Sequence, residues 1–312
     1  SGGIKTYISE KKRFIHKDKS LSHVLIVPGD SDKIESYDNQ RVYHVKGIQL
    51  PNYKSYRFIV RMDKIFKILQ KEKPDIIEIG SPYLMPYPAM LYRKISRKPV
   101  IGFYHTDFPE CYVRPFLEKS FKKKNYSGYL QIAENYNRFI YSKCNALIVS
   151  TDKFYDKLSQ MRIRNIEQIS LGVDLELFHP HKRNKEIRKE WQAAESDKIF
   201  IYSGRLDEEK RITLLLSAIK DVSKKIQGKF VIIGDGPKKE KAVNLASENS
   251  HVFYYPYEKN RNQLAEYLAS ADVYITAGPH ETFGLSIIEA QASGLPVLGV
   301  RSGALIDRVR ES

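Results

Sequence analysis

Two glutamates with seven residues between them stand in the stretch PHETFGLSIIEAQASGLPV, residues 279–297. Glu281 precedes a Phe-Gly-Leu-Ser turn, and Glu289 follows it in a segment whose helical periodicity begins after the glycine. Four backbone N–H groups at such a helix start have no intrahelical partner and lie beside the positive end of the helix dipole. They belong to Phe283, Gly284, Leu285 and Ser286. A helix start of this kind binds anions and would suit a diphosphate.

The two carboxylates have a chemistry of their own. An ionised carboxylate accepts two hydrogen bonds at once, so paired carboxylates commonly bind the vicinal hydroxyls of a sugar. Glu281 lies in the loop, whereas Glu289 lies one to two turns into the helix and needs a polar group to meet it. The alternative is an acid that complements the helix dipole, Glu281, and a solvated helix residue, Glu289.

Two cations follow another predicted strand in SGRLDEEKR, residues 203–211. Arg205 comes just past the strand, and Lys210 stands at the start of the next helix. Arginine binds a diphosphate as a fork and lysine binds it as a point charge, so together they would neutralise it. A pair of solvated surface charges is the alternative.

Glycines mark two further turns. Gly234 and Gly236 lie in IGDGP after a strand, but the third glycine of a dinucleotide fingerprint is missing, which argues against a nicotinamide cofactor and leaves a tight turn as the alternative. Gly2 and Gly3 head a predicted helix, a second helix start open to an anion. The GxxxxGK[ST] spacing of a Walker loop is absent.

One histidine stands at a strand end. In GFYHTDFPE, residues 102–110, His105 and Thr106 end a predicted strand, with Asp107 and Glu110 nearby. A lone histidine is more often structural, but the strand-end position favours a functional role, so both interpretations remain. The acidic run DSD at 30–32, with IESYDNQ after it, is predicted to be a solvated loop rather than a metal site.

The elements that position these residues are strands and helices in alternation. This pattern predicts an α/β fold with parallel sheets covered by helices. Strands are expected at 23–29, 43–50, 75–82, 99–106, 145–151, 198–206, 229–237, 251–257, 272–280 and 296–300. Helices are expected at 3–14, 58–73, 87–96, 129–144, 211–226, 238–249, 262–271 and 285–293. We expect two Rossmann-like domains, 1–172 and 173–312, that face one another across a cleft, with ligands beyond the carboxyl ends of the strands.

Composition bounds the classes of protein. Of the net charge of +15, the first 170 residues carry +14, with 31 Lys and Arg against 17 Asp and Glu, and the remainder carries +1, with 21 against 20. This asymmetry indicates an anionic partner for the first half. No apolar run is long enough to cross a bilayer. Cys111 and Cys144 are too few for a disulfide framework, which fits a cytoplasmic location.

Together these features resemble a retaining nucleotide-sugar glycosyltransferase of family 4, with the GT-B fold, over nearly the whole chain. The strongest element is Glu281-(seven residues)-Glu289 with Gly294-Leu295-Pro296-Val297 behind it. The supporting elements, in the family's order, are Gly2-Gly3, His105-Thr106, Gly172-Val173-Asp174 with Phe178 and Pro180, Gly204-Arg205-Leu206 with Lys210, and Gly234-Asp235-Gly236-Pro237. The HTDFPECYVRP run is most similar to the lipid-directed and mannosyl-transferring branches.

The resemblance implies a role for each candidate. Arg205 and Lys210 would hold the donor diphosphate, and main-chain groups at 283–286 would cradle phosphate and sugar. Glu281 would contact the transferred sugar, Glu289 the nucleotide ribose, and His105 the reacting sugar. Five glycines are predicted on the donor side: Gly2, Gly3, Gly204, Gly234 and Gly236. The acceptor-side candidates are Thr106 and Asp107, and no metal or other cofactor is expected.

The chain also departs from the family pattern. Members usually begin with a strand before the glycine pair and continue beyond VRSGALIDRV, so we expect a fragment that lacks both ends. Tyr255-Pro256-Tyr257 stands where the family often has a glycine near the nucleotide base.

The predicted reaction moves a hexose from a UDP- or GDP-sugar to a lipid, glycan or small-molecule acceptor. The basic first half could hold an anionic membrane surface on the inner face of the membrane, through Arg93, Lys94, Arg97 and Lys98 or through Lys119 and 122–124. The alternatives are a non-catalytic protein that binds anionic surfaces or nucleic acid, and an inactive nucleotide-sugar-binding fragment. No nucleic-acid module is recognisable, so nucleic acid is not expected as a partner.

Overall fold

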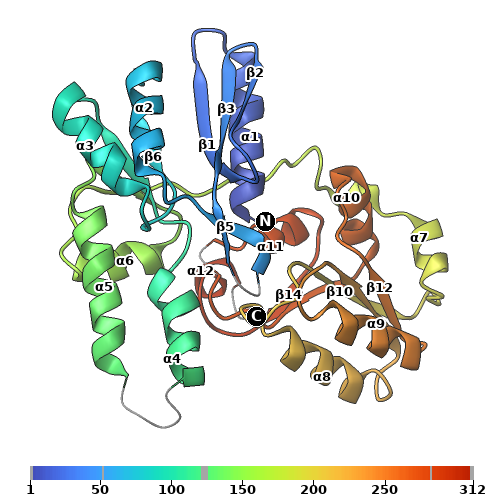
Figure 1. The fold of residues 1–312 in the computed structure, drawn as a ribbon. Coiled ribbons are helices and arrows are strands. Elements are labelled where there is room, and N and C mark those ends of the chain that lie inside the picture. Colours follow the sequence, from blue (N-terminus) through green and yellow to red (C-terminus); the bar gives the residue numbers. More distant parts are fainter. Residues whose placement is uncertain (1–2, 51–52, 121–125, 282, 310–312) are drawn as a thin grey trace. The chain divides into compact units, whose positions relative to one another are not determined.

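Runs of Ile, Val, Phe and Tyr form parallel strands in the computed structural model of the chain (Figure 1). The structure describes residues 3–50, 53–120, 126–281 and 283–309. Contacts divide these residues into a first unit, Gly3–Ile169, and a second unit that begins at Ser170.

The first unit carries three sheets. Its strands are β1 (His23–Gly29), β2 (Lys33–Tyr37), β3 (Gln40–Lys46), β4 (Ile48–Leu50), β5 (Tyr53–Phe58), β6 (Ile77–Ile79), β7 (Val100–Phe103), β8 (Ala146–Val149) and β9 (Ile166–Gln168). Its helices are α1 (Gly3–Lys17), α2 (Met62–Glu72), α3 (Pro86–Ser96), the π-helical turn η1 (Pro109–Val113), α4 (Arg114–Ser120), α5 (Ser127–Tyr141) and α6 (Asp152–Gln160). The sheet β6-β7-β8-β9 is parallel throughout, as predicted.

The acidic run at 30–32 lies in an exposed loop, as predicted, but Lys33–Tyr37 in the polar stretch that follows forms β2, antiparallel to β3. The hairpin closes because Asp38, with φ 44°, and Asn39 make a two-residue turn between the paired residues Tyr37 and Gln40. Asp32, the second acid of that run, accepts a hydrogen bond from the Lys46 amide at 2.9 Å. It is therefore part of the hairpin's support.

Two other boundaries also differ from the prediction. The expected strand 43–50 is divided between β3 and β4, and β4 pairs antiparallel with β5 instead of extending the first sheet. Phe58, expected to begin a helix, ends β5. The pairing of β4 with β5 is itself irregular, with a register shift between Gln49 and Leu50.

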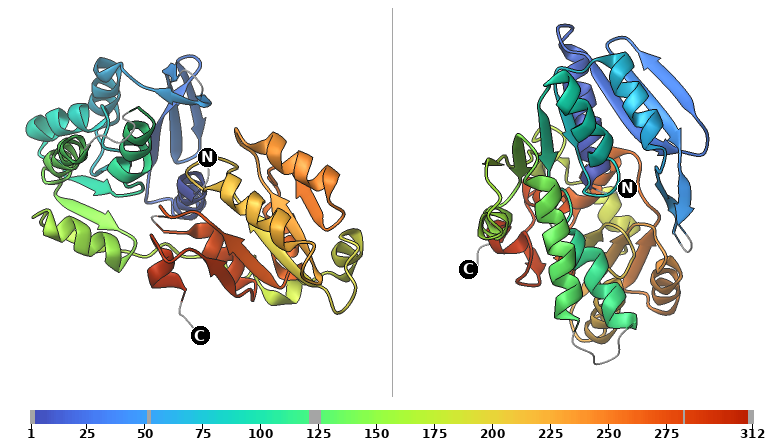
Figure 2. Two further views of the ribbon diagram at one scale, coloured as in Figure 1. Left: turned by 90° about the horizontal axis from the view of Figure 1, so that it is seen from below. Right: turned by 60° about the vertical axis from the view of Figure 1, so that its left-hand side comes forward.

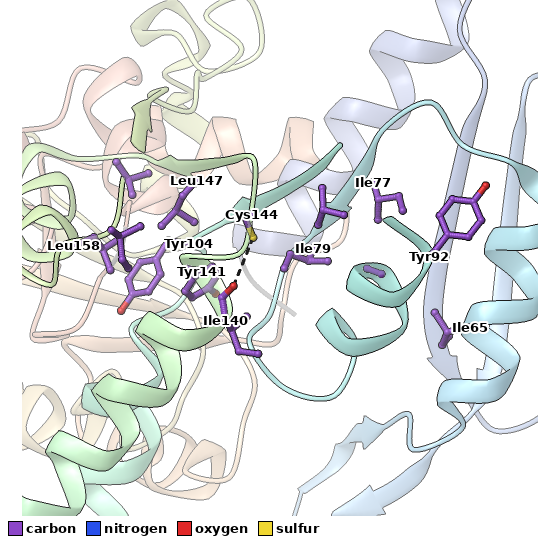
Figure 3. Packing of buried hydrophobic residues seen from close by; sticks show 14 of the residues in the cluster. Ile65, Ile77, Ile79, Tyr92, Tyr104, Ile140, Tyr141, Cys144, Leu147 and Leu158 are labelled. Atoms are coloured by element: carbon purple, nitrogen blue, oxygen red, sulfur yellow. Dashed lines mark hydrogen bonds between the residues drawn. The ribbon is translucent and has the colours of Figure 1, made fainter. Parts of the chain in front are cut away.

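The core of the first unit lies around β6, β7 and β8 (Figure 3). Val100, Leu147 and Val149 are fully buried there. The thiol of Cys144 lies 3.9 Å from the carbonyl oxygen of Ile140, and burial raises its pKa to about 11. A thiol with so high a pKa stays protonated at neutral pH and packs as an apolar group.

The second unit is a doubly wound parallel sheet. Its strands are β10 (Lys198–Ser203), β11 (Gly228–Ile233), β12 (Val252–Tyr255), β13 (Val273–Thr276) and β14 (Val297–Gly299). Its helices are the 3-10 turn η2 (Pro180–Lys182), α7 (Lys185–Glu190), α8 (Ile212–Val222), α9 (Lys239–Glu248), α10 (Arg261–Ser270), α11 (Leu285–Ala292) and α12 (Leu305–Arg308). The order β12-β11-β10-β13-β14 reverses direction between β10 and β13, which makes their carboxyl ends the expected ligand site.

Alternate side chains along β10 belong to two different hydrophobic cores. Ile199 and Ile201 are buried with residues of α10 and α11, whereas Tyr202 is buried with residues of α8 and α9. The helices therefore cover both faces of the sheet, as expected for parallel strands (Figure 1). Figure 2 shows this unit, coloured yellow to red, from two further sides.

Replacing Ile201 with alanine should destabilise the second unit by about 2 to 5 kcal/mol, because Ile201 is fully buried and a cavity would remain. Trp191 is the single tryptophan of the chain and packs in the same core, so its fluorescence during urea unfolding reports on this unit. Leu214→Ala, at an exposed position of α8, is the matched control and should change stability by less than about 0.5 kcal/mol. Equal effects of the two substitutions would contradict the core assignment.

Candidate functional site

The loops that follow β10 and β13 meet through an ion pair. The Lys210 ammonium contacts the Glu281 carboxylate, and both side chains are largely buried. A Cβ at Gly278 would lie 3.2 Å from Cδ of Lys210, so the glycine permits this approach. The structure thus brings together a predicted phosphate-binding cation and a predicted sugar-binding acid.

Lys210 keeps its charge in this setting. Burial disfavours the ammonium, but the carboxylates of Glu281 and Glu209 outweigh that cost and raise the pKa of Lys210. The lysine is therefore cationic at neutral pH and able to meet a phosphate.

Arg205 is held between two acids that the sequence analysis did not single out. Its Nη1 lies 2.5 Å from Asp207 Oδ2, and its Nη2 lies 2.5 Å from Glu209 Oε2. Burial raises the pKa of Asp207, and the guanidinium opposes that rise. The Tyr202 hydroxyl donates to the Arg205 carbonyl at 2.7 Å and fixes the backbone. Both acids lie within four residues of Arg205 in a turn that precedes α8, where helical spacing gives no indication of the contact.

Helix α11 begins as predicted, directly after Gly284. This glycine has φ 80°, and the amides of Ile287 and Ile288 donate to its carbonyl at 2.9 and 3.1 Å. The amides of Leu285 and Ser286 lie in the first turn, where an α-helix supplies no acceptor of its own. These amides are the candidate anion donors.

Phe283 is a candidate for ligand contact through its backbone and not through its side chain. Its side chain is buried, and the Arg308 guanidinium lies over its ring at 4.4 Å from the centroid.

A segment after β14 supports the Glu281 loop, and sequence analysis missed it. The Ala304 amide donates to the Glu281 carbonyl at 2.8 Å, and the Ser302 hydroxyl donates to the Pro279 carbonyl at 2.9 Å. Gly303, with φ 62°, has both of these carbonyls 2.8 Å from where a Cβ would stand. A larger residue at 303 would push the Glu281 loop away.

Glu289 lies inside α11 with only 6% of its surface exposed. Burial raises its pKa, and the nearby Arg261 guanidinium opposes that rise. Nη2 of Arg261 donates to Oε1 of Glu289 at 2.9 Å. The alternative of a solvated helix glutamate is therefore wrong.

Gly204, Gly234 and Gly236 lie where the loops after β10 and β11 approach each other closely. A Cβ at Gly234 would stand 2.0 Å from the Gly204 carbonyl oxygen, and one at Gly236, with φ 152°, would stand 2.6 Å from the Leu206 carbonyl oxygen. The Leu206 amide donates to the Asp235 carbonyl at 2.9 Å. The close approach of two backbones accounts for these glycines, and their contact with a donor stays a prediction.

His105 follows β7 in the first unit. Its ring stacks on Phe103 with centroids 3.9 Å apart and approaches Tyr7 of α1 at 5.1 Å. Burial lowers the pKa of His105 to about 4; Glu78 opposes this shift, and Lys11 adds to it. The imidazole is therefore neutral at physiological pH.

The other candidates of the first unit differ in their surroundings. Gly3 begins α1 and is exposed, whereas Gly2 lies outside the described residues. Thr106 is partly exposed. Asp107 is buried, and it accepts hydrogen bonds from the Tyr104 hydroxyl at 2.9 Å and from Lys157 Nζ at 2.7 Å.

The predicted acceptor-side role of Asp107 stays a prediction, and these hydrogen bonds give the residue a structural role as well. Its carboxylate joins the segment after β7 to α6 through Lys157, a partner 50 residues away that no local pattern indicates. Within the described ranges, no three His, Cys, Asp or Glu side chains are grouped so that they could hold a metal ion.

Two sequence family models match the chain. The model described as "Glycosyltransferase Family 4" matches residues 1–177, and "Glycosyl transferases group 1" matches 183–311. A GDP-mannose-dependent alpha-mannosyltransferase of Corynebacterium glutamicum is 28% identical over 92% of this chain and 66% of its own length. An alpha-monoglucosyldiacylglycerol synthase of Streptococcus pneumoniae is 26% identical over 95% of this chain and 67% of its own length. The chain thus spans about two thirds of these curated relatives.

Solved structures also resemble this one. A sucrose-phosphate synthase from Thermosynechococcus elongatus matches with a TM-score of 0.72 and 20% identity, over 98% of this chain and 77% of that protein. The likeness confirms the predicted GT-B fold class.

We expect the His105 ring to titrate near pH 4, as measured by NMR of its ring nuclei. An unfolded histidine titrates near pH 6.5, so between these values the unfolded chain binds a proton that the folded chain does not. His105 therefore lowers stability as pH falls from about 6.5 toward 4, and His105→Gln should lose less stability over that window. A titration midpoint near 6.5 would contradict the buried, neutral imidazole.

Proposed function

This chain belongs to glycosyltransferase family 4, and we propose that it transfers a hexose from a UDP- or GDP-sugar to a lipid, glycan or small-molecule acceptor. The transfer would retain the anomeric configuration and would use no metal ion. The observation that carries the proposal is the contact of Lys210 with Glu281, which joins the two loops at the point where the strand order reverses.

The proposed site meets the main demand of the reaction. The nucleotide diphosphate leaves with growing negative charge while positive charge develops on the sugar, so the protein must stabilise the leaving group. Arg205, Lys210 and the amides of Leu285 and Ser286 supply positive charge and donors at the carboxyl end of the sheet. The proposed role of Arg205 and Lys210 is therefore to bind and stabilise the diphosphate.

Binding of the donor would be an exchange of partners. Arg205 and Lys210 are already paired with three carboxylates, from Asp207, Glu209 and Glu281. A diphosphate carries enough charge to compete for both cations, so the three carboxylates would give up these ion pairs on binding. Because Glu281 lies against the phosphate-binding lysine, it is positioned to accept hydrogen bonds from the sugar attached to that phosphate.

The neutral state of His105 suits the proposed contact with the reacting sugar. A cationic imidazole would repel the positive charge that develops on the sugar ring, and the pKa of about 4 prevents this at neutral pH. Thr106 remains a proposed acceptor-side residue beside it.

A lipid acceptor is favoured by the relative whose name includes diacylglycerol. No described helix is both long and apolar enough to cross a bilayer. A peripheral contact with a membrane would then require an exposed apolar surface with basic residues beside it.

Helix α3 presents such a surface, here called the α3 face, formed by the exposed residues Tyr87, Leu91 and Ile95 at a spacing of four. Lys94 and Arg97 are exposed beside Ile95, at the carboxyl-terminal end of α3. Each basic residue near an anionic membrane contributes about 1 kcal/mol. Of the other predicted basic residues, 122–124 lie outside the described residues, as does the side chain of Lys119.

Titration of the purified chain with UDP- and GDP-sugars by calorimetry tests the donor class. We expect one nucleotide to be preferred. Lys210→Ala and Arg205→Ala should each raise the barrier to transfer by about 2 to 4 kcal/mol, roughly 30- to 1,000-fold in rate, like loss of one preorganised donor. Lys220→Ala, at an exposed position of α8, is the control and should change neither binding nor rate.

An alternative function predicts a different outcome. A nucleic-acid-binding protein that uses the basic first half would bind DNA or RNA with a strong salt dependence and would show no preference among nucleotide sugars. That result would replace the proposed function.

Flotation with vesicles tests the α3 face. The chain should float with vesicles that contain phosphatidylglycerol and should not float with neutral ones. The pair Leu91→Glu and Ile95→Glu should abolish flotation, because it places acids where apolar contact is proposed. Leu214→Glu, similarly exposed on α8, is the control. Flotation without lipid dependence, or an unaffected α3 variant, would exclude this surface.

A further inference from the structure

We propose that Arg261 is a positioning residue: its guanidinium holds the Glu289 carboxylate in the orientation that accepts the ribose hydroxyls of a nucleoside diphosphate. The inference rests on the proposed function, because Glu289 is assigned to the ribose there. It adds a residue that neither the family signature nor the local sequence indicates.

The first observation is the hydrogen bond itself. Nη2 of Arg261 lies 2.9 Å from Oε1 of Glu289, a carboxylate with a side chain only 8% exposed. In the part of the chain that the structure describes, this is the hydrogen bond that reaches the carboxylate. Oε2 and the second lone pair of Oε1 remain as acceptors, enough for two hydroxyls.

The second observation concerns how Arg261 is held. Its guanidinium lies over the ring of Phe178, 4.8 Å from the centroid, and Phe178 is fully buried in the core of the second unit. A planar guanidinium stacked on an aromatic face loses little further freedom when it donates a hydrogen bond. Arg261 is thus fixed on one side by a core residue and on another by Glu289.

The third observation is the unfavourable place of the charge. Arg261 is the first residue of α10, just after the cap Asn260, whose side chain accepts from the Asn262 amide at 3.0 Å. A cation at a helix N-terminus opposes the helix dipole, so local helix energetics do not favour arginine here. The contact with Glu289 offsets that cost, and removal of the guanidinium would leave a buried carboxylate without its partner.

These contacts predict an effect on ligand discrimination. The guanidinium of Arg261 contacts Glu289, and its side chain is 35% exposed, so a ligand that binds Glu289 would lie beside it. A carboxylate held in one rotamer presents both acceptors to vicinal hydroxyls, whereas a free one must be ordered on binding. Loss of Arg261 should therefore weaken the preference for ribose over deoxyribose.

The test is calorimetric titration of the purified chain with UDP and GDP, and with the 2′-deoxy and 3′-deoxy analogues of each. The ratio of deoxy to ribo Kd measures discrimination, and we expect about tenfold or more for the unmodified chain. Arg261→Gln and Glu289→Gln should each reduce the ratio about fivefold or more. The double variant should match Glu289→Gln, because both substitutions act on one contact.

The matched control is Arg183→Gln. Arg183 also pairs with a partly buried carboxylate of the second unit, with Nη2 2.8 Å from Asp272 Oδ1, but it lies at η2 and has no proposed ligand. This variant should lower the unfolding midpoint and leave the ratio unchanged. Arg261→Lys keeps a point charge without the planar fork, so it should retain only part of the discrimination.

The outcomes are separable. If the unmodified chain binds neither UDP nor GDP, the proposed function is overturned and this inference with it. Nucleotide binding with full discrimination in Arg261→Gln, alongside lost discrimination in Glu289→Gln, would overturn the role of Arg261 alone. If Arg261→Gln does not fold, Arg261→Lys decides: unchanged discrimination overturns the proposal, and a reduced ratio supports it.

Discussion

The ion pair between Lys210 and Glu281 is the contact on which the candidate site depends. Parallel strands direct all their carboxyl ends to one edge of the sheet, and the reversal of strand order between β10 and β13 leaves the loops that follow them free to meet there. Gly278 permits the approach, and Gly303 lets a third loop support it. Each loop carries only part of the charged groups of the candidate site, so the site is complete only when the two loops meet.

A second constraint is that charges removed from water must be paired. Arg205 lies between Asp207 and Glu209, Glu289 is paired with Arg261, and Asp107 with Lys157. Such pairs contribute little net stability, but losing one partner is costly. In the second unit this would make the proposed binding of a diphosphate an exchange of partners at Arg205 and Lys210. In the first unit the same rule pairs Asp107 with Lys157, which joins the segment after β7 to α6.

The local sequence pattern predicted a helix or strand correctly where the structure of that segment depends on its own residues. Short β-branched runs became strands of the second unit, and runs with apolar residues every three or four positions became α8 to α11 within a few residues of the predicted bounds. It failed at β2, where polar residues form a strand because the turn at Asp38 and Asn39 pairs them with β3. Pairing across the hairpin therefore outweighs the low strand propensity of the polar residues.

The sequence by itself determined which residues are the candidates for the chemistry: Arg205, Lys210, Glu281 and Glu289 occur in short stretches where spacing places them at strand ends and a helix start. Only the tertiary structure decided their partners. Arg261 lies 28 residues from Glu289, and Lys157 lies 50 residues from Asp107. No periodicity spans such distances, because packing of whole elements, and not the geometry of any one of them, sets which side chains meet.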